Sequence, residues 1–224
     1  MPSVIDALSA PSQRTPQFST RSNTADNIER ALAEDGHRLW GFVVYRCAYG
    51  DDAAWAQRVA GLRRRAGETL AYYNGADLLD RLAVTVVEDR EALDGASAAS
   101  VRQHFAAWAA AAVAREQGTD RAGLSQRYRY CVRVSDEGEG GDDDDDDDDR
   151  DEEDDFVDLI WRDWEPSVPD PREASLEPVE GCTRPDVGWM RVSTRSVMVE
   201  MYDLLRDQNA WYSEYRRPPE VVCR

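Results

Sequence analysis

The chain has 224 residues, enough for one sizeable hydrophobic core, and a formal net charge of −18 at pH 7. All 27 basic residues are arginine, which excludes a Schiff-base lysine, a lysine general base and the lysine of a phosphate-binding loop. The only histidines are His37 and His104, which excludes a three-histidine zinc site. We therefore expect no metal site and no cofactor.

The sequence also limits the cellular compartment. The longest apolar stretch, Ala106–Ala114, is too short to cross a membrane, and the first residues lack the basic start and apolar core of a secretory signal. The four cysteines lie far apart and form no C-x-x-C pair, which is typical of reduced thiols inside the cell. We expect a protein of the cytoplasm or nucleus that is not secreted and has no membrane partner.

The first elements in chain order are a tail, a short helix and a strand. Residues 1–26 are expected to be a disordered tail, and residues 27–224 a single domain. A short helix ending at Gly36 leads into Leu39–Tyr49 (LWGFVVYRCAY), which is apolar on both faces of an extended chain until Arg46. This pattern predicts an inner strand covered on both sides, where each large apolar side chain contributes about 2 kcal/mol on burial.

Two long helices alternate with the next strand. Asp51 and Asp52 cap the first helix, whose apolar stripe runs at helical spacing from Trp55 to Tyr73. A strand over 82–88 follows, and Ser97 caps a second helix that ends at Gly118. These signals predict helices over about 52–73 and 98–117.

The segment Gln126–Ser135 alternates strictly between two faces. Tyr128, Tyr130, Val132 and Val134 share one face, and Arg127, Arg129, Cys131 and Arg133 share the other. This pattern predicts a half-exposed strand. Phe156–Trp164 is also extended, and we expect it to pair antiparallel with the first.

Between these strands lies an acidic segment, 136–155. It holds sixteen acidic residues and one arginine, a net charge of −15, so the rest of the chain carries only −3. Eight consecutive aspartates repel one another and bury nothing, so we expect a disordered acidic insertion. A second interpretation is that this insertion folds back on Arg127, Arg129 and Arg133.

The C-terminal third is irregular at both ends. A proline-rich connector leads through a short strand near Ser193 to a helix with its apolar stripe over Val197, Met201 and Leu204. The last thirteen or so residues contain Pro218–Pro219, and we expect them to be an extended strap or an edge strand. The whole order predicts an α+β fold with a mixed or mainly antiparallel sheet and helices mostly on one face, for which a ferredoxin-like arrangement is one model.

Several stretches resemble a family of uncharacterised proteins from ascomycete fungi. They are LWGFVVYRCAYGDDAAW, VVEDREALDGAS, VRQHFAAW and the long EGCTRPDVGWMRVSTRSVMVEMYDLLRDQNAWYSEYRRPPEVV, which together cover most of 39–222. The resemblance implies a fungal source and a single domain. It transfers no activity and no site residues.

The candidate functional residues fall into two groups, and we expect no catalytic residue. Tryptophan, tyrosine and arginine anchor protein interfaces, so the C-terminal group predicts a protein partner or a homo-oligomer. Its members are Trp211, Tyr212, Tyr215, Arg216 and Arg217. The alternative is a small-molecule binding protein or enzyme with a pocket between helices and sheet, in which Arg127, Arg129, Arg133 and His104 bind an anionic ligand.

Binding to nucleic acid is disfavoured. The tyrosines and arginines of 126–135 point to opposite faces, and the acidic insertion repels phosphate. The leading hypothesis is therefore a non-catalytic, intracellular protein-interaction domain.

Overall fold

The computed structural model describes residue 14 and residues 23–136, 155–166 and 176–224. Most of the expected N-terminal tail and of the expected acidic insertion lies outside these residues. Within them, six strands form one sheet in the order β2-β1-β3-β4-β5-β6. The strands are β1 (Val43–Arg46), β2 (Thr85–Val87), β3 (Tyr130–Val134), β4 (Phe156–Trp161), β5 (Trp189–Ser193) and β6 (Val221–Val222).

The sheet is mixed. Strand β1 pairs in parallel with β2 and β3, β4 runs antiparallel to β3 and β5, and β6 is parallel to β5. The expected antiparallel pairing of the strand near 126–135 with the strand after 156 is therefore confirmed, in the register Val132↔Leu159. The fold is α+β with a mixed sheet, as the sequence predicts.

Helices connect the strands. The α-helices are α2 (Thr24–Asp35), α3 (Asp52–Tyr72), α4 (Arg90–Leu93), α5 (Ala98–Gln117), α6 (Tyr202–Leu204) and α7 (Ala210–Glu214). The 3₁₀ turns η1 (Ala76–Arg81) and η2 (Gln126–Tyr128) and the π-helix η4 (Val197–Met201) complete the elements. Asp51 and Ser97 cap α3 and α5, as the sequence predicts, by accepting hydrogen bonds from amides of the first turn.

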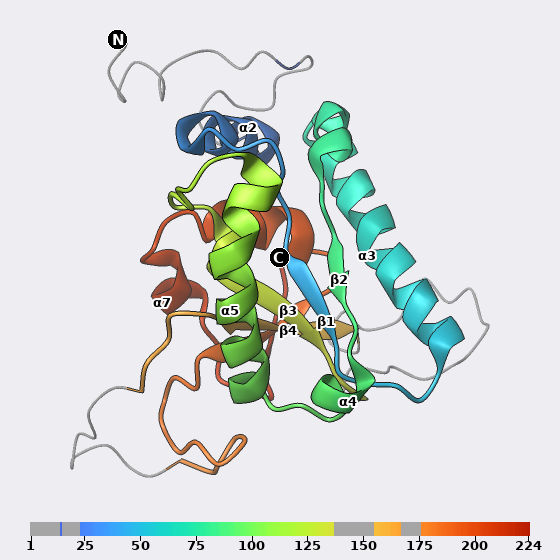
Figure 1. The fold of residues 1–224 in the computed structure, drawn as a ribbon, viewed down its shortest axis with the longest axis vertical. Helices are drawn as coiled ribbons and strands as arrows, with labels where there is room; N and C mark the ends of the chain where they lie inside the picture. Colours follow the sequence, from blue (N-terminus) through green and yellow to red (C-terminus); the bar gives the residue numbers. More distant parts are fainter. Residues whose placement is uncertain (1–13, 15–22, 137–154, 167–175) are drawn as a thin grey trace.

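Strand β1 is buried on both faces. Val44 faces the core formed with α2, α3, η4, α6 and α7, whereas Val43 and Tyr45 face the core formed with α4 and α5. Helices therefore lie mostly on one face of the sheet, and α5 crosses the other (Figure 1). The inner strand predicted at Leu39–Tyr49 is confirmed, although its regular part is only four residues long.

Three expectations require correction. Strands β1 and β2 are direct neighbours, whereas a ferredoxin-like fold has another strand between the two strands of its βαβ unit. Strand β3 is fully buried, not half-exposed, because it lies between β1 and β4 and both its faces are covered. Residues 24–26 belong to helix α2 and not to a tail, since Asn23 caps that helix.

The C-terminal strap is a mixture of elements. The short helix α7 occupies its first part, and β6 is an edge strand on β5, so the edge-strand expectation holds only for the last residues. Among the described residues, no helix combines the length and the apolar character needed to span a membrane.

Asp203 links the stability of the fold to pH. Its carboxylate accepts a hydrogen bond from Asn27 of α2 at 2.9 Å. Burial raises the pKa of Asp203 from 3.8 to about 6, although hydrogen bonds from Asn27 and Thr24 oppose the shift. Because the pKa of Asp203 is higher in the folded than in the unfolded state, protonated Asp203 is compatible with folding at low pH. Folding becomes less favourable as the pH rises through about 6 and the buried carboxyl must ionise.

We expect Asp203→Asn to be more stable than the wild type at pH 8 by up to about 3 kcal/mol, because the buried charge is absent. The advantage should shrink as the pH falls from about 6 and disappear well below 3.8, where Asp203 is protonated in both the folded and the unfolded state. Urea unfolding across this pH range measures the difference. An advantage independent of pH would contradict the assignment.

Candidate functional site

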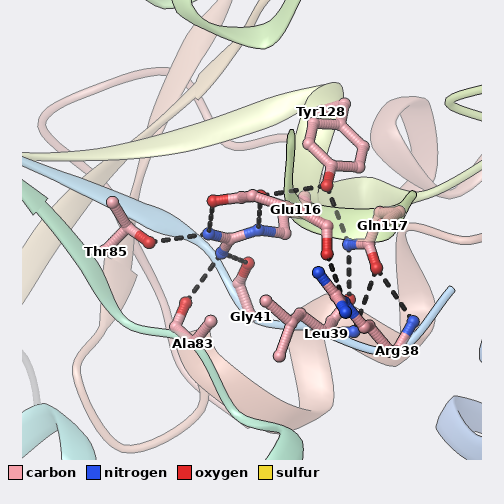
Figure 2. A network of polar contacts seen from close by, with 9 residues as sticks. Arg38, Leu39, Gly41, Ala83, Thr85, Glu116, Gln117 and Tyr128 are labelled. Carbon is pink, nitrogen blue, oxygen red and sulfur yellow. Dashed lines mark hydrogen bonds and ion pairs between the residues drawn. The ribbon is translucent and has the colours of Figure 1, made fainter. Parts of the chain in front are cut away.

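Arg127, predicted as a ligand-binding residue, is fully buried and paired inside the fold. Its guanidinium donates to both oxygens of Glu116, with Nε–Oε2 at 2.8 Å and Nη2–Oε1 at 2.9 Å. It also donates to the carbonyls of Gly41 and Ala83 at 2.9 and 2.7 Å and to Thr85 Oγ1 at 2.6 Å (Figure 2). The side chain therefore joins the C-terminal end of α5 to the backbone leading into β1 and β2.

The local backbone explains this position. The 3₁₀ turn η2 precedes β3, so Arg127 does not follow the alternation of the strand and points toward α5. Gly41 has a φ of 101°, and a Cβ there would lie 2.7 Å from Leu82 Cδ1. Glycine at this position therefore allows the close approach of β1 and the segment before β2 whose carbonyls Arg127 binds.

Gln117 completes the network beside Glu116. Its Oε1 accepts from the amides of Arg38 and Leu39, and its Nε2 donates to the Leu39 carbonyl and to Tyr128 Oη at 3.1 and 2.7 Å (Figure 2). Burial opposes ionisation of Glu116, but Arg127 outweighs it and lowers the pKa of this carboxyl. The network is therefore a structural ion pair surrounded by satisfied hydrogen bonds.

Arg133 is the second buried arginine of the predicted ligand group. It lies between two carboxylates, with Nε–Asp158 Oδ2 at 2.9 Å and Nη1–Glu180 Oε1 at 2.5 Å. Burial works against its charge, but attraction to Asp158 and Glu180 prevails and raises the pKa of Arg133. Its guanidinium also lies 5.0 Å from the centre of the Trp189 ring. Every strong interaction of Arg133 is thus internal.

Arg129 and His104 lie elsewhere. Arg129 donates to Tyr130 Oη and to the Leu205 carbonyl at 3.2 and 3.4 Å. His104 is exposed on α5, and its Nδ1 lies 3.0 Å from the hydroxyl of Tyr45. Burial raises the pKa of Tyr45 well above its usual range, so this hydroxyl stays protonated.

The four predicted ligand residues therefore do not converge. Arg127 contacts the residues that lead into β1 and β2, whereas Arg133 lies toward the carboxyl end of β3, in register with Tyr45 of β1. Glu116, Asp158 and Glu180, which neutralise the two buried arginines, were not identified from the sequence. Their separations of 11, 25 and 47 residues from their partners leave no local pattern.

The carboxyl ends of β1 and β3 are filled by the protein itself. Open α/β sheets commonly bind ligands at this edge. Here Arg46 is buried between the rings of Tyr49 and Trp55, at 4.6 and 5.3 Å from their centres. Its Nη2 donates to Asp52 at 2.5 Å, and its Nη1 lies 3.9 Å from Glu88. Sequence analysis identified Arg46 only as the end of the apolar stretch.

The C-terminal aromatic residues divide into a buried and an exposed set. Trp211 is fully buried, stacks on Tyr130 and donates from Nε1 to Asp186 at 2.9 Å. Tyr215 accepts from the amide of Val187. Arg217 donates to the carbonyls of Arg184, Glu177 and Cys182 at 2.8–3.0 Å. These three fasten the strap to the domain.

Tyr212 and Arg216 belong to the exposed set. Tyr212 is 68 % exposed and packs its ring edge-on against Trp161. Arg216 is exposed and donates to the carbonyls of Ser213, Glu214 and Tyr215 in its own turn. Of the five predicted interface residues, these two are presented to solvent.

The four cysteines, all within the described residues, form no disulfide and differ in accessibility. Cys47 and Cys131 are buried, Cys182 is half-buried and Cys223 is exposed. Burial raises the pKa of Cys47 to about 12, even though the nearby Arg133 lowers it. Burial likewise raises the pKa of Cys131. Both are neutral thiols near pH 7 and poor nucleophiles.

Comparison with known proteins adds no relative. No protein-family model matches the chain, and searches of curated proteins and of solved structures find no significant match. Within the described part of the chain, no group of three or more histidine, cysteine or acidic side chains is placed to hold a metal ion. The interpretation of the site therefore depends on the geometry of this chain alone.

Removing Glu116 should destabilise the fold strongly, because it leaves the charge of Arg127 buried without its partner. We expect Glu116→Ala to lower the free energy of unfolding by about 3 kcal/mol near pH 7. Because the pKa of Glu116 is lowered on folding, this contribution should fade as the pH falls below the usual range of a glutamate. Chemical denaturation measures both effects.

Glu68→Ala is the matched control. Glu68 pairs with Arg64 on the exposed side of α3, where both side chains are more than half exposed. Such a surface pair contributes about 0.5 kcal/mol or less. Equal losses for the two variants would contradict the structural role assigned to Glu116.

Thiol labelling of the native protein should follow the burial order. We expect Cys223 to react rapidly with an aromatic disulfide reagent, Cys182 more slowly, and Cys47 and Cys131 only when the protein unfolds. Mass spectrometry of labelled peptides assigns each site. Rapid labelling of Cys47 in the native protein would show that its thiol is more accessible and more ionised than described here.

Proposed function

We propose that this chain is a non-catalytic, intracellular protein-interaction domain, and that it binds its partner through the α7 surface. We define this surface as Tyr212 and Arg216, with Trp161 as the ring beneath the tyrosine. The observation that carries the proposal is the exposed tyrosine, which is 68 % accessible yet held against a fixed aromatic ring. A large, rigid aromatic group presented to solvent is a common anchor of protein interfaces.

The tyrosine is pre-organised by the residues beneath it. Trp161 lies 6.0 Å from the Tyr212 ring at an interplanar angle of 82°. Trp161 is itself packed against Trp211 and Tyr130, with ring centres 5.4 and 6.4 Å away. Because this aromatic column is anchored in the core, Tyr212 loses little side-chain entropy when a partner binds.

Arg216 adds a charge next to the tyrosine. All its hydrogen bonds are to backbone carbonyls of its own turn, and no described carboxylate lies within ion-pair distance. Its positive charge is therefore available to a partner. Arginine is, with tryptophan and tyrosine, among the residues that contribute most to interface energies.

Two further observations favour protein binding over the alternative, an anionic small molecule. Arg127 and Arg133 already bind Glu116, Asp158 and Glu180, so an anion would have to displace buried ion pairs. The carboxyl edge of the parallel strands holds Arg46 with its own carboxylate partners. The four cysteines of the described residues form no disulfide, which supports an intracellular location.

The test compares three variants of tagged full-length chain. The partner is first identified by cross-linking and mass spectrometry in the native cell and is then purified. We expect Tyr212→Ala to weaken its binding about thirtyfold, corresponding to about 2 kcal/mol for an interface anchor. Arg216→Ala should weaken it less, and Tyr72→Ala should not change it.

Tyr72 is the matched control because it is 64 % exposed, is also packed edge-on against a tyrosine, and lies at the end of α3. A partner bound equally well by the wild type and Tyr212→Ala would overturn the assignment of the α7 surface. A measured enzymatic turnover that depends on His104 would overturn the non-catalytic proposal.

A further inference from the structure

An arginine that precedes helix α2 in the chain lies among three carboxylates. The side chain of Arg14 is only 6 % exposed. Its Nη1 donates to Asp26 Oδ1 and Glu29 Oε2 at 2.8 and 2.7 Å, and its Nη2 donates to Asp77 Oδ2 at 3.2 Å. Burial works against the charge of this guanidinium, but attraction to the three carboxylates outweighs it and raises the pKa of Arg14. We call the three acidic residues around the guanidinium the carboxylate pocket.

The walls of the carboxylate pocket come from folded elements. Asp26 and Glu29 lie three residues apart on α2, so they share one side of that helix. Asp77 lies in η1, directly after α3, and the end of α3 lies beside α2 (Figure 1). Asn23 fixes this contact by donating to the Tyr73 carbonyl at 3.0 Å. The bound arginine belongs to none of these elements, so its removal leaves the backbone of the pocket intact.

Gly75 keeps the space beside the guanidinium open. A Cβ at this position would lie 2.3 Å from the Cβ of Ala25, so α2 could not approach the turn after α3. The same Cβ would lie 3.5 Å from Arg14 Nε and from Leu70 Cδ2. The guanidinium therefore has small and apolar groups near its Nε and carboxylates at its Nη atoms. This arrangement suits a flat, weakly hydrated cation better than a compact ammonium.

The carboxylate pocket is open to solvent on one side. The side chains of Glu29 and Asp77 are 48 and 60 % exposed, whereas that of Asp26 is 11 % exposed and lies deeper. Asp26 Oδ2 is buried and accepts no hydrogen bond within the part of the chain that the structure describes. A guanidinium that is free to turn in the pocket can donate to this oxygen as well. Without a cation, the three carboxylates would repel one another.

We propose that the carboxylate pocket is a binding site for the guanidinium of an arginine, filled by Arg14 within the chain and by an arginine of another polypeptide when Arg14 is withdrawn. The pocket recognises the cation and not the sequence around it, because the guanidinium itself makes the three ion pairs. Arg14 is an intramolecular ligand with a high effective concentration, so an outside arginine binds weakly while Arg14 is in place. The site lies on α2 and η1 and shares no residue with the α7 surface.

The test titrates the full-length chain with an acetylated and amidated peptide of residues 11–17, measured by isothermal titration calorimetry. The peptide should bind Arg14→Ala about tenfold more tightly than the wild type, because Arg14 no longer competes. A scrambled peptide of the same composition should bind Arg14→Ala within about threefold of the native sequence. A peptide carrying Arg14→Lys should bind about fivefold more weakly, because the ammonium is compact and strongly hydrated.

Second substitutions in the Arg14→Ala chain locate the site. Asp77→Ala should weaken peptide binding about fivefold, whereas Asp80→Ala, which removes another exposed aspartate of η1, should not change it. If circular dichroism shows Arg14→Ala to be unfolded, Arg14→Lys takes its place and should also bind the peptide more tightly than the wild type.

Four results would each overturn the proposal. They are equal affinity of the wild type and the Arg14 variant, binding of the native peptide sequence only, equal binding of the lysine peptide, and binding that Asp77→Ala leaves unchanged.

Discussion

The burial of β1 on both faces is the constraint on which the rest of the structure depends. A strand whose successive side chains are all apolar must be covered twice, so the sheet needs a layer of helices on each side. Helices α3 and η4 with their neighbours cover the Val44 face, and α5 covers the Val43 face. Strand β3 lies directly beside β1 and is therefore buried as well. Its one arginine, Arg133, consequently points into the protein, where Asp158 and Glu180 neutralise it.

Arginine suits this task better than lysine, because its planar guanidinium donates up to five hydrogen bonds in fixed directions. Arg127 uses these donors to hold one carboxylate, two carbonyls and a hydroxyl at once. Arg217 joins three carbonyls of the segment before β5 to the C-terminal strap in the same way. Many of the arginines therefore cross-link elements that are distant in sequence. On the strap, Tyr212 and Arg216 remain exposed, and they are the basis of the proposed function.

Local signals were sufficient for much of this fold. The two-faced apolar pattern located β1, the caps Asp51 and Ser97 located the two long helices, and period-two alternation located β3 and its partner. The exposure of β3 could not be predicted, because alternating arginines are typical of a solvent face and their partners Glu116, Asp158 and Glu180 are remote in sequence. For the same reason, the sequence predicted that Arg127 and Arg133 bind a ligand, whereas the structure places them in two separate internal ion pairs. In the strap, the prolines predicted an extended chain. The structure instead has the short helix α7 at its start, with Trp211 of this helix buried in the core.

Native-state hydrogen exchange tests the central claim most directly. If β1 is the doubly covered centre of one cooperative unit, the amides of Val43–Arg46 should exchange only when the whole domain unfolds. Their free energies of exchange should then equal the global free energy of unfolding from denaturant titration under the same conditions. Amides of β1 that exchange through a smaller opening, with α5 or α3 separating from the sheet while the rest stays folded, would contradict the account.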